Sequence, residues 1–312
     1  MEKEKLTVLM TTYNENNDVL RGAIDSILTQ SYSNFKFLIV VDNPENMTAI
    51  ELLNDYCEKD SRIRILINEQ NLGLPKALNR GIEAIDTEFI ARMDADDIAL
   101  PNRFELQMSF LEKNPQVDII GTNIVYMDQN GNYLSHKGKI PTGYNFIKKV
   151  MRCANIYNHP TYMGKTEIFR KYKYRNLKYS QDYDFMCRLI ENSCIVDNIP
   201  DYLLQYRQVN VTNIEKRVRR KVIYYCIQNC YKNKTLTNTD IEKLAEETVC
   251  KVDKEKLFEA MNLYDIALEE LKSHKYMSGF KNMMKSFFAS PIIRAQVMGL
   301  IRYQMLKIVY KR

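Results

Sequence analysis

The stretch Phe89-Ile90-Ala91-Arg92-Met93-Asp94-Ala95-Asp96-Asp97 runs from a short apolar segment straight into three carboxylates. An apolar run of this length that ends in polar residues is typical of a buried strand. Similar runs recur before and after it, separated by segments with apolar residues at the three- and four-residue spacing of helices. The expected strands are 6–10, 35–41, 63–67, 89–93 and 119–126, and the expected helices are 19–29, 47–59, 75–85 and 103–113. This alternation predicts the α/β class, with a mostly parallel sheet flanked by helices.

The chain changes character after residue 125. The turn signal Asp128-Gln129-Asn130-Gly131 is followed by a mixed pattern up to about Val211. Helical patterns then follow at 214–231, 240–249, 253–271, 276–289 and 292–310, with a break at Ser290-Pro291. We therefore expect one domain over residues 1–211, with halves 1–125 and 126–211, and a helical C-terminal region over residues 212–312.

Composition and cysteine usage indicate a folded protein in a reducing compartment. The 312 residues are 45% hydrophobic and 27% charged. The seven cysteines include no Cys-X-X-Cys pair and stand in apolar segments, which predicts reduced, buried thiols in the cytoplasm. Residues 1–5 are mostly charged and lead directly into the first expected strand, so we expect no signal peptide. No stretch reaches the roughly 18 apolar residues of a membrane span.

The basic residues gather at the C-terminal end. The formal net charge is +6, and after Glu270 nine lysines and arginines follow without any acidic residue. Such a bias indicates an anionic partner, either membrane lipid or nucleic acid. Apolar residues recur at helical spacing between these cations, and a helix with one basic and one apolar face suits an anionic bilayer surface. We expect peripheral membrane contact through residues 272–312; the alternative is a helix that packs on the amino-terminal domain with its lysines in solvent.

Four polar segments follow expected strands: Thr11–Asn14, Asp42, Asn68–Asn71 and Asp94–Asp97. Ligands of open parallel sheets bind beyond the carboxyl ends of the strands, so these segments should face one crevice. The carboxylates of Asp94 and Asp96 suit Mg²⁺ or Mn²⁺, which takes one or two protein carboxylates together with substrate phosphates. The alternative is a solvated acidic turn that caps the helix after Pro101.

A turn that runs into a helix completes the pattern: Asn71-Leu72-Gly73-Leu74-Pro75-Lys76-Ala77-Leu78-Asn79-Arg80-Gly81. Together with Tyr13-Asn14, Asp42 and Asp94-Ala95-Asp96, it resembles the amino-terminal half of the family 2 glycosyltransferases of bacterial polysaccharide type. The resemblance covers roughly residues 5 to 210. It implies a GT-A fold with a Rossmann-like sheet, in which residues 1–125 form the nucleotide-binding half and residues 126–211 the acceptor-side half. It also implies inverting transfer of a sugar from a nucleoside diphosphate, usually with a divalent cation.

The resemblance implies a role for each matching residue. The ring of Tyr13 offers a face for stacking and the Asp42 carboxylate accepts from a base N–H, although each alone also suits ordinary loop chemistry. Lys76 would lie near the donor diphosphate, and Asp96 would be the ligand of Mn²⁺ or Mg²⁺. The expected donor-binding residues are Thr11, Tyr13, Glu15, Asp42, Asn71, Lys76, Asn79, Asp94 and Ala95.

The same resemblance points to an acceptor-side motif in Tyr179-Ser180-Gln181-Asp182-Tyr183-Asp184. Single displacement needs a base that takes the proton of the acceptor hydroxyl, and Asp182 is the expected catalytic base. Its alternative role is capping of a helix N-terminus. Asp184 lies two positions on and points to a different side of the helix.

The sequence departs from the family pattern at two places, and a histidine matches it at a third. Gln181 stands where the family commonly has glutamate. Val209 stands where many relatives carry a histidine that helps to bind the metal or the diphosphate, so Asp96 would be the main protein ligand. His159 matches a recurring element near the acceptor side, and it is alternatively a structural hydrogen bonder.

Two other functions remain open from the sequence. A non-catalytic nucleotide-sugar binding module would have the same crevice but no need for Asp182. A nucleotidyltransferase would use the acidic loop for phosphoryl chemistry, yet Thr11–Asn14 has no glycine-rich phosphate loop. No motif for nucleic-acid binding is present. We expect transfer from a UDP-sugar to a lipid-linked glycan of a surface polysaccharide, at the inner face of the cell membrane.

Overall fold

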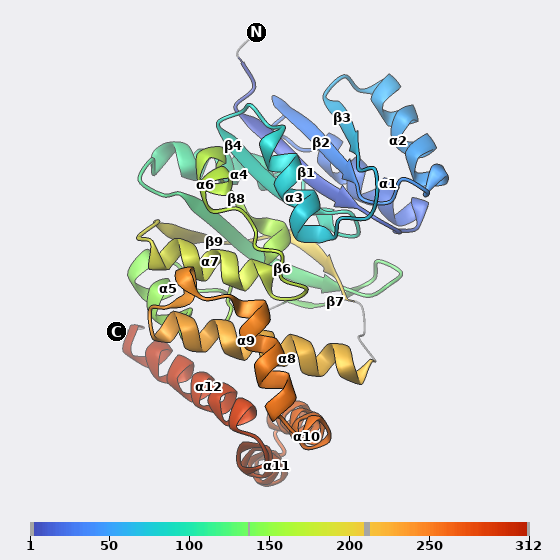
Figure 1. Ribbon diagram of the computed structural model, residues 1–312. Coiled ribbons are helices and arrows are strands. Elements are labelled where there is room, and N and C mark those ends of the chain that lie inside the picture. Colours follow the sequence, from blue (N-terminus) through green and yellow to red (C-terminus); the bar gives the residue numbers. More distant parts are fainter. Residues whose placement is uncertain (1–2, 137, 209–212, 311–312) are drawn as a thin grey trace. The chain divides into compact units, whose positions relative to one another are not determined.

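The computed structural model describes residues 3–136, 138–208 and 213–310 (Figure 1). The chain divides into two compact units. Unit 1 contains Met1–Ile147, Ile156–Asn176 and Asn192–Val209, and unit 2 contains Lys148–Asn155, Leu177–Glu191 and Asn210–Arg312. Two segments that precede the expected boundary near residue 211 therefore group with the C-terminal helices.

Unit 1 is built on one sheet with the strand order β3-β2-β1-β4-β8-β6-β9-β5, and β7 pairs with β6. Strands β1 to β4 are mutually parallel, whereas β8 runs antiparallel between β4 and β6. β9 is parallel to β6 and antiparallel to β5. The bounds are β1 Leu6–Thr12, β2 Phe35–Val41, β3 Ile63–Ile67, β4 Phe89–Asp94, β5 Ile98–Ala99, β6 Ile119–Met127, β7 Tyr133–His136, β8 Met163–Lys165 and β9 Val196–Arg207. The long pairings are parallel, which confirms the predicted class.

The helices of unit 1 lie between these strands in sequence. They are α1 Asn17–Leu28, α2 Met47–Lys59, α3 Leu74–Glu83, α4 Arg103–Lys113 and α6 Thr166–Tyr172, while α5 Tyr144–Val150 spans the boundary of the two units. Asparagine side chains begin two of them, since Asn16 accepts from the amide of Asp18 and Asn46 from that of Ala49. All the elements predicted for the first 125 residues that are named above are confirmed, with small differences at their ends.

The packing of β1 on both of its faces fixes the positions of the loops that follow the parallel strands. Its side chains are buried on both faces, which accounts for the continuous apolar run. Val8 packs in the core with residues of α1, α2 and α4, whereas Leu9 faces α3. A Cβ added at Gly81 of α3 would lie 2.4 Å from Leu9 Cδ1, so a larger residue there would force the buried Leu9 side chain to shift. The contact fixes α3 against the sheet and thereby fixes the loop that precedes it.

Four strands were not predicted from the sequence. β5 and β8 have two and three residues, which is too short for a periodic pattern. β7 is exposed along its length. β9 spans twelve residues, but Pro200 and the register shifts against β6 interrupt its alternation. These strands depend on their partners and not on local preference.

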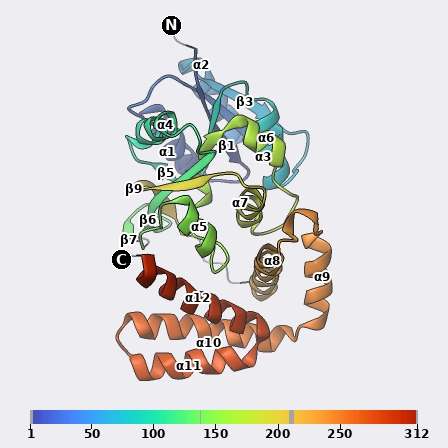
Figure 2. The same ribbon diagram turned by 90° about the vertical axis from the view of Figure 1, so that its left-hand side faces the viewer.

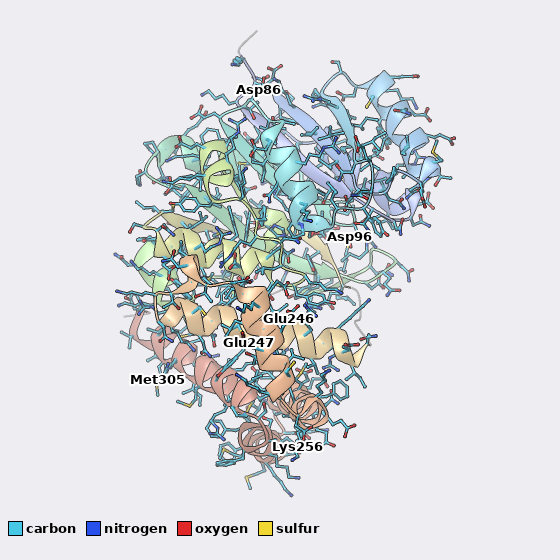
Figure 3. All side chains as sticks on the ribbon, in the orientation of Figure 1. Asp86, Asp96, Glu246, Glu247, Lys256 and Met305 are labelled. Carbon is cyan, nitrogen blue, oxygen red and sulfur yellow. The ribbon has the colours of Figure 1, made fainter. Side chains whose placement is uncertain are left out.

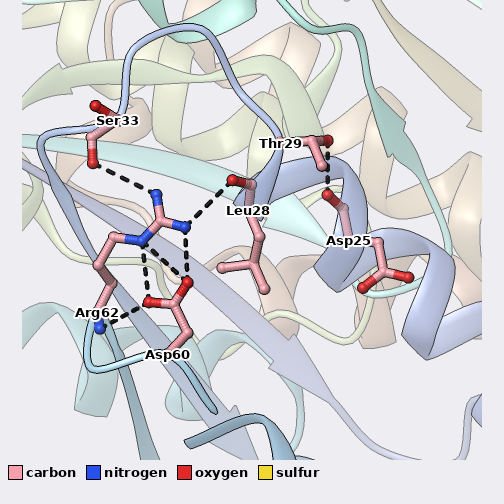
Figure 4. Close-up of polar contacts among 6 residues, drawn as sticks. All are labelled: Asp25, Leu28, Thr29, Ser33, Asp60 and Arg62. Atoms are coloured by element: carbon pink, nitrogen blue, oxygen red, sulfur yellow. Dashed lines mark hydrogen bonds and ion pairs between the residues drawn. The ribbon is translucent and has the colours of Figure 1, made fainter.

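Arg62 links the turn before β3 to the connection between α1 and β2, at the amino-terminal end of these parallel strands (Figure 4). The Arg62 guanidinium pairs with Asp60 at 2.7 Å and donates to the carbonyl oxygens of Leu28 at 3.2 Å and Ser33 at 3.4 Å. Its Cζ also lies 4.7 Å from the ring centroid of Phe35. In this way the turn before β3 is tied to the end of α1 and the start of β2.

Unit 2 is helical in its described residues. Its helices are α7 Gln181–Glu191, α8 Ile214–Lys232, α9 Ile241–Lys251, α10 Lys254–Lys272, α11 Tyr276–Ala289 and α12 Pro291–Tyr310. α8 packs against α7, α9, α10 and α12, and Figure 2 shows α10, α11 and α12 lying side by side. The C-terminal helices predicted from the sequence are confirmed. None of the helices in the described ranges has both the length and the apolar character that crossing a bilayer requires.

Candidate functional site

The loops after β1, β2, β3 and β4 line a cavity of about 430 Å³ in unit 1. The strand register creates it, because Thr11 of β1 is paired with Asp94 of β4 and Thr12 with Val41 of β2. The lining residues are Thr11, Thr12, Tyr13, Glu15, Asp42, Asn71, Gly73, Leu74, Ala77, Asp94, Ala95, Asp96 and Tyr206. The predicted crevice at the carboxyl ends of the parallel strands is therefore present.

Three carboxylates gather on the β4 side of this cavity. Asp94, Asp96 and Asp97 each place an oxygen within 4.8 Å of the other two, and Asp96 is labelled in Figure 3. Burial, followed by repulsion from Asp94 and Glu15, raises the pKa of Asp96 to about 6. Asp97 is fully buried; burial, then Asp94 and Asp96, raises its pKa well above the usual range. The negative charge of the cluster is thus incompletely balanced by the protein.

Two buried arginines lie beneath the cluster. Arg92 is 2% exposed and forms an ion pair with Asp94, while its Nε and Nη1 have no hydrogen-bond partner among the described residues. Arg103 donates to the carbonyl oxygen of Arg92 at 2.7 Å and to Gln107 Oε1 at 3.0 Å. Burial, with the nearby Arg92, lowers the pKa of Arg103 to about 9. These cations stabilise the carboxylates from the protein side and leave the cavity side acidic.

This donor set fits a divalent cation. Asp94 and Asp96 line the cavity, and Asp97 Oδ2 is buried without a hydrogen-bond partner among the described residues. Carboxylate oxygens are the ligands that Mg²⁺ and Mn²⁺ prefer. A cation would also lower the raised pKa of Asp96, because it stabilises the ionised form.

The loop after β1 is held by one glutamate. Glu15 Oε2 accepts from the Thr12 hydroxyl at 2.6 Å and from the amide of Tyr13 at 2.7 Å. Tyr13 lines the cavity and is 43% exposed. Tyr13 thus presents an open aromatic face, and Glu15 supports the loop that carries it.

Asp42, which follows β2, holds a second loop of the cavity through hydrogen bonds. Its carboxylate accepts from Asn68 Nδ2 at 2.6 Å and from the amides of Leu72 and Gly73, each at 2.9 Å. Gly73 has a φ of 80°, which a side chain would disfavour. Asp42 lines the cavity as predicted, but most of its hydrogen-bonding capacity already holds the loop that ends at Gly73.

Of the three expected donor-binding residues near the start of α3, one lines the cavity and two do not. Asn71 lines the cavity, and its Oδ1 accepts from the amide of Gly73 at 2.9 Å. Lys76 is exposed and does not line the cavity. Asn79 does not line it either, because its amide donates to the Tyr174 carbonyl at 2.7 Å and accepts from the Tyr174 amide at 2.9 Å. Asn79 therefore fastens α3 to the segment after α6.

Sequence reasoning missed Tyr206, which reaches the cavity from β9. Its ring contacts Tyr126 edge-on with centroids 6.1 Å apart. Burial, followed by the negative charge of Asp94, raises its pKa above the usual range, so the phenol remains a hydrogen-bond donor. Nothing in the local sequence indicated a role for Tyr206. It lies more than a hundred residues after Asp96, and only strand pairing in the sheet brings the two residues to the same cavity.

The next residue braces the acidic loop. Arg207 donates from its amide to Asp97 Oδ1 at 2.9 Å and from Nε to the Asp96 carbonyl at 2.8 Å. Its Nη1 donates to the Gln129 carbonyl at 2.6 Å. Val209, where relatives were expected to carry a histidine, lies outside the described residues.

The expected acceptor-side residues belong to different units of the chain. Asp182 belongs to unit 2, in the first turn of α7, and its Oδ2 accepts from Asn155 Nδ2 at 3.0 Å. Asp184 is fully buried and pairs with Arg188 at 2.8 Å, which separates its role from that of Asp182. His159 lies 3.0 Å from the Tyr174 hydroxyl, and burial with the nearby Arg92 lowers its pKa well below the usual range. Burial thus favours the neutral imidazole of His159, and the contact with Tyr174 holds it within unit 1.

A family model and several relatives of known name match this chain. The family model described as Glycosyl transferase family 2 matches residues 7–177. An uncharacterized glycosyltransferase of Methanocaldococcus jannaschii is 39% identical over 239 residues, which are 75% of this chain and 82% of that protein. The O-antigen biosynthesis glycosyltransferase WbnJ of Escherichia coli is 31% identical over 220 residues, 69% of this chain and 85% of that protein. These matches favour sugar transfer over a binding module or nucleotidyl transfer.

Solved structures give the same fold. S. aureus TarS residues 1–349, in complex with UDP-GlcNAc, superposes with a TM-score of 0.59 at 15% identity, covering 98% of this chain and 91% of that chain. The amylovoran biosynthesis glycosyltransferase AmsE of Erwinia amylovora adds a relative at 30% identity over 203 residues, 64% of this chain and 75% of that protein. The GT-A fold expected from the sequence is confirmed.

Proposed function

Because the chain belongs to glycosyltransferase family 2, we propose that it transfers a sugar from a uridine diphosphate donor to a hydroxyl group, with inversion at the anomeric carbon. Relatives named for O-antigen and amylovoran biosynthesis place this chain among homologues of polysaccharide biosynthesis. We further propose that the acceptor is a lipid-linked glycan. TarS, which shares the fold, was solved with UDP-GlcNAc, and this supports uridine as the base.

The observation that carries the proposal is the cavity of about 430 Å³, whose lining includes both the exposed Tyr13 and two carboxylates of the acidic cluster. A uracil would stack on Tyr13, next to Thr11 and Asp42. The diphosphate would extend toward Asp94 and Asp96. The Tyr206 phenol would donate to a phosphate or sugar oxygen on the same side.

Asp94 and Asp96 would hold Mn²⁺ or Mg²⁺, with Asp96 as the main ligand. When bound, the cation supplies positive charge that stabilises the departing diphosphate. Arg92 and Arg207 keep the two carboxylates in place, through the ion pair to Asp94 and the hydrogen bond to the Asp96 carbonyl. The Asp94 carboxylate also remains available to the ribose of the donor.

Asp182 is the proposed base. It takes the proton of the acceptor hydroxyl as that oxygen attacks the anomeric carbon, while the bond from this carbon to the diphosphate oxygen breaks on the opposite face. Asn155 Nδ2 donates to Oδ2 of this carboxylate and helps to fix its orientation. This role is carried over from the family and rests on the match of the motif around Asp182.

The tail supports membrane contact, which we propose for residues 272–312. The apolar residues of this tail fall into two groups. Ile292, Ile293 and Val297 are buried, so part of α12 packs within unit 2. Others remain open to solvent, notably Phe280 at 64%, Phe288 at 68% and Met305 at 61%. Exposed bulky apolar residues between lysines and arginines suit the surface of an anionic bilayer.

A donor screen tests the central proposal. Thermal shift with UDP- and GDP-sugars, with and without Mn²⁺, should give stabilisation by a UDP-sugar that increases with the metal and is lost in Asp96→Asn. If no nucleotide sugar stabilises the chain in either condition, the proposal is wrong.

Turnover tests the base separately. With a defined acceptor, Asp182→Asn should lower kcat by roughly 10²- to 10⁴-fold while the donor still stabilises the protein. Asp201→Asn, the same change at an exposed position of β9, is the matched control and should keep full turnover. Full turnover in Asp182→Asn would remove only the base assignment.

A further inference from the structure

Unit 2 contains a second cavity, lined on several sides by cations. Its volume is about 480 Å³, and its lining is Lys149, Arg152, Cys153, Lys232, Arg302, Met305 and Leu306. No carboxylate is among these residues. Across the described ranges, none of the four cations forms an ion pair with an acidic side chain.

The backbone fixes these cations next to one another. The carbonyl of Cys153 accepts from Gln228 Nε2 of α8 at 2.8 Å, which holds the turn after α5 against α8. A Cβ added at Gly299 would lie 2.6 Å from the same Cys153 carbonyl oxygen, so glycine lets α12 approach this turn. One turn further along α12, Arg302 joins Arg152 at the cavity. These two contacts hold the turn after α5, α8 and α12 together without any contribution from Arg152 or Arg302.

This arrangement has an electrostatic cost that an anion would remove. Burial, followed by the nearby Arg302, lowers the pKa of Lys232 below the usual range. Lys149 and Lys232 have neutral partners, the Tyr310 hydroxyl at 2.5 Å and Gln228 Oε1 at 3.1 Å. Arginine guanidinium groups bind phosphate oxygens through two parallel hydrogen bonds, which makes Arg152 and Arg302 suitable for a phosphate group.

An apolar ridge on α12 adjoins the cavity. Ile301, Met305 and Ile308 follow one another at four- and three-residue spacing and therefore share one side of the helix. They are 43%, 61% and 66% exposed, and Figure 3 labels Met305 on α12. Met305 and Leu306 also line the cavity. A ligand with both an anionic head and a hydrocarbon chain matches this combination.

We propose that the cavity binds the phosphate or diphosphate head of a membrane lipid, with the hydrocarbon chain along Ile301, Met305 and Ile308. The shared chemistry is a phosphate group, and the ridge favours a lipid over a free ion because a free ion would have no use for it. The inference deepens the membrane contact proposed above and rests on that contact. It adds a defined site to what would otherwise be general attraction between basic residues and an anionic surface.

Flotation of the full chain with vesicles tests the site. The vesicles are phosphatidylcholine alone or phosphatidylcholine with phosphatidate, and donor sugar and divalent metal are left out. Arg152→Gln with Arg302→Gln removes two cavity cations; Lys281→Gln with Lys285→Gln removes two exposed cations of α11 and is the matched control. We expect the cavity pair to lose at least about tenfold more affinity for phosphatidate vesicles than the control pair, because hydrogen bonds to phosphate add to general attraction.

The outcomes separate the site from the broader proposal. Equal losses for the two pairs would overturn the cavity site and leave the membrane contact standing. No binding of the unmodified chain to phosphatidate vesicles would overturn both. Calorimetric titration with inorganic pyrophosphate in EDTA distinguishes the source: binding that needs Arg152 and Arg302, without vesicle binding, would replace the lipid with a free ion. Asp96→Asn should bind vesicles like the unmodified chain, so failure of the donor site leaves this result intact.

Discussion

Arg92 and Asp94, two residues apart on β4, form an ion pair in which the guanidinium is 2% exposed and the carboxylate is 27% exposed. The arginine reaches this depth only because β4 is a central strand, with β1 on one side and β8 on the other. A charge so deep in unit 1 needs a partner, and Asp94 is that partner. The acidic cluster is therefore tied to the core of the sheet and not only to its surface loop.

Removal of the carboxylate should destabilise the fold as well as the site. Asp94→Ala leaves Arg92 buried without its anion, and we expect a loss of about 3 kcal/mol in the free energy of unfolding. Asp86→Ala removes the exposed ion pair with Lys36, and should cost no more than about 1 kcal/mol. Urea denaturation of both variants measures the difference. Equal, small losses would show that Arg92 is not dependent on Asp94.

Asp42 should act mainly through the loop that it holds. Asp42→Asn keeps one acceptor oxygen but cannot accept from both Asn68 and the two backbone amides as the carboxylate does. We expect a loss of about 1–3 kcal/mol in the free energy of unfolding, together with a higher KM for the donor. An unchanged stability with a higher KM would instead assign Asp42 to direct recognition of the base.

The Tyr206 hydroxyl should contribute to donor binding. Tyr206→Phe keeps the ring contact with Tyr126 and removes only the donor group, so we expect KM for the nucleotide sugar to rise by about 2- to 10-fold. Tyr126→Phe is the matched control, since Tyr126 does not line the cavity. An equal effect of both changes would mean that the hydroxyl acts through packing.

Lys221 should make stability depend on alkaline pH. Burial lowers its folded-state pKa from 10.5 to about 8, and its Nζ donates to Gln296 Oε1 at 2.6 Å. Between these two values the unfolded chain binds the proton and the folded chain does not, so this residue's contribution should increase stability from pH 8 to 10.5. Below that window both states carry the charge, and its burial cost is present in full.

Lys221→Met should remove that dependence. At neutral pH the variant should be more stable than the unmodified chain by on the order of 1 kcal/mol, because no charge is buried. The test compares the unfolding midpoints of the two proteins across the alkaline range. Parallel curves for the two would show that Lys221 is not the group responsible.

The sequence alone determined the elements whose pattern is local. The strand of Phe89–Asp94, the helix of Met47–Lys59 and the C-terminal helices follow from apolar periodicity, which reflects burial on one or both faces. It also identified the acidic cluster and Tyr13, because the ends of parallel strands meet at one edge of a sheet.

The tertiary structure decided what depends on residues far apart in the chain. β8 exists because β4 and β6 offer it two edges, and Tyr206 reaches the cavity only through the pairing of β9 with β6. Only the folded chain shows that Asp42 is largely occupied by its own loop and that Asn79 binds Tyr174. The physical reason is that hydrogen-bond partners and burial are set by packing between distant segments, whereas periodicity is written along one segment.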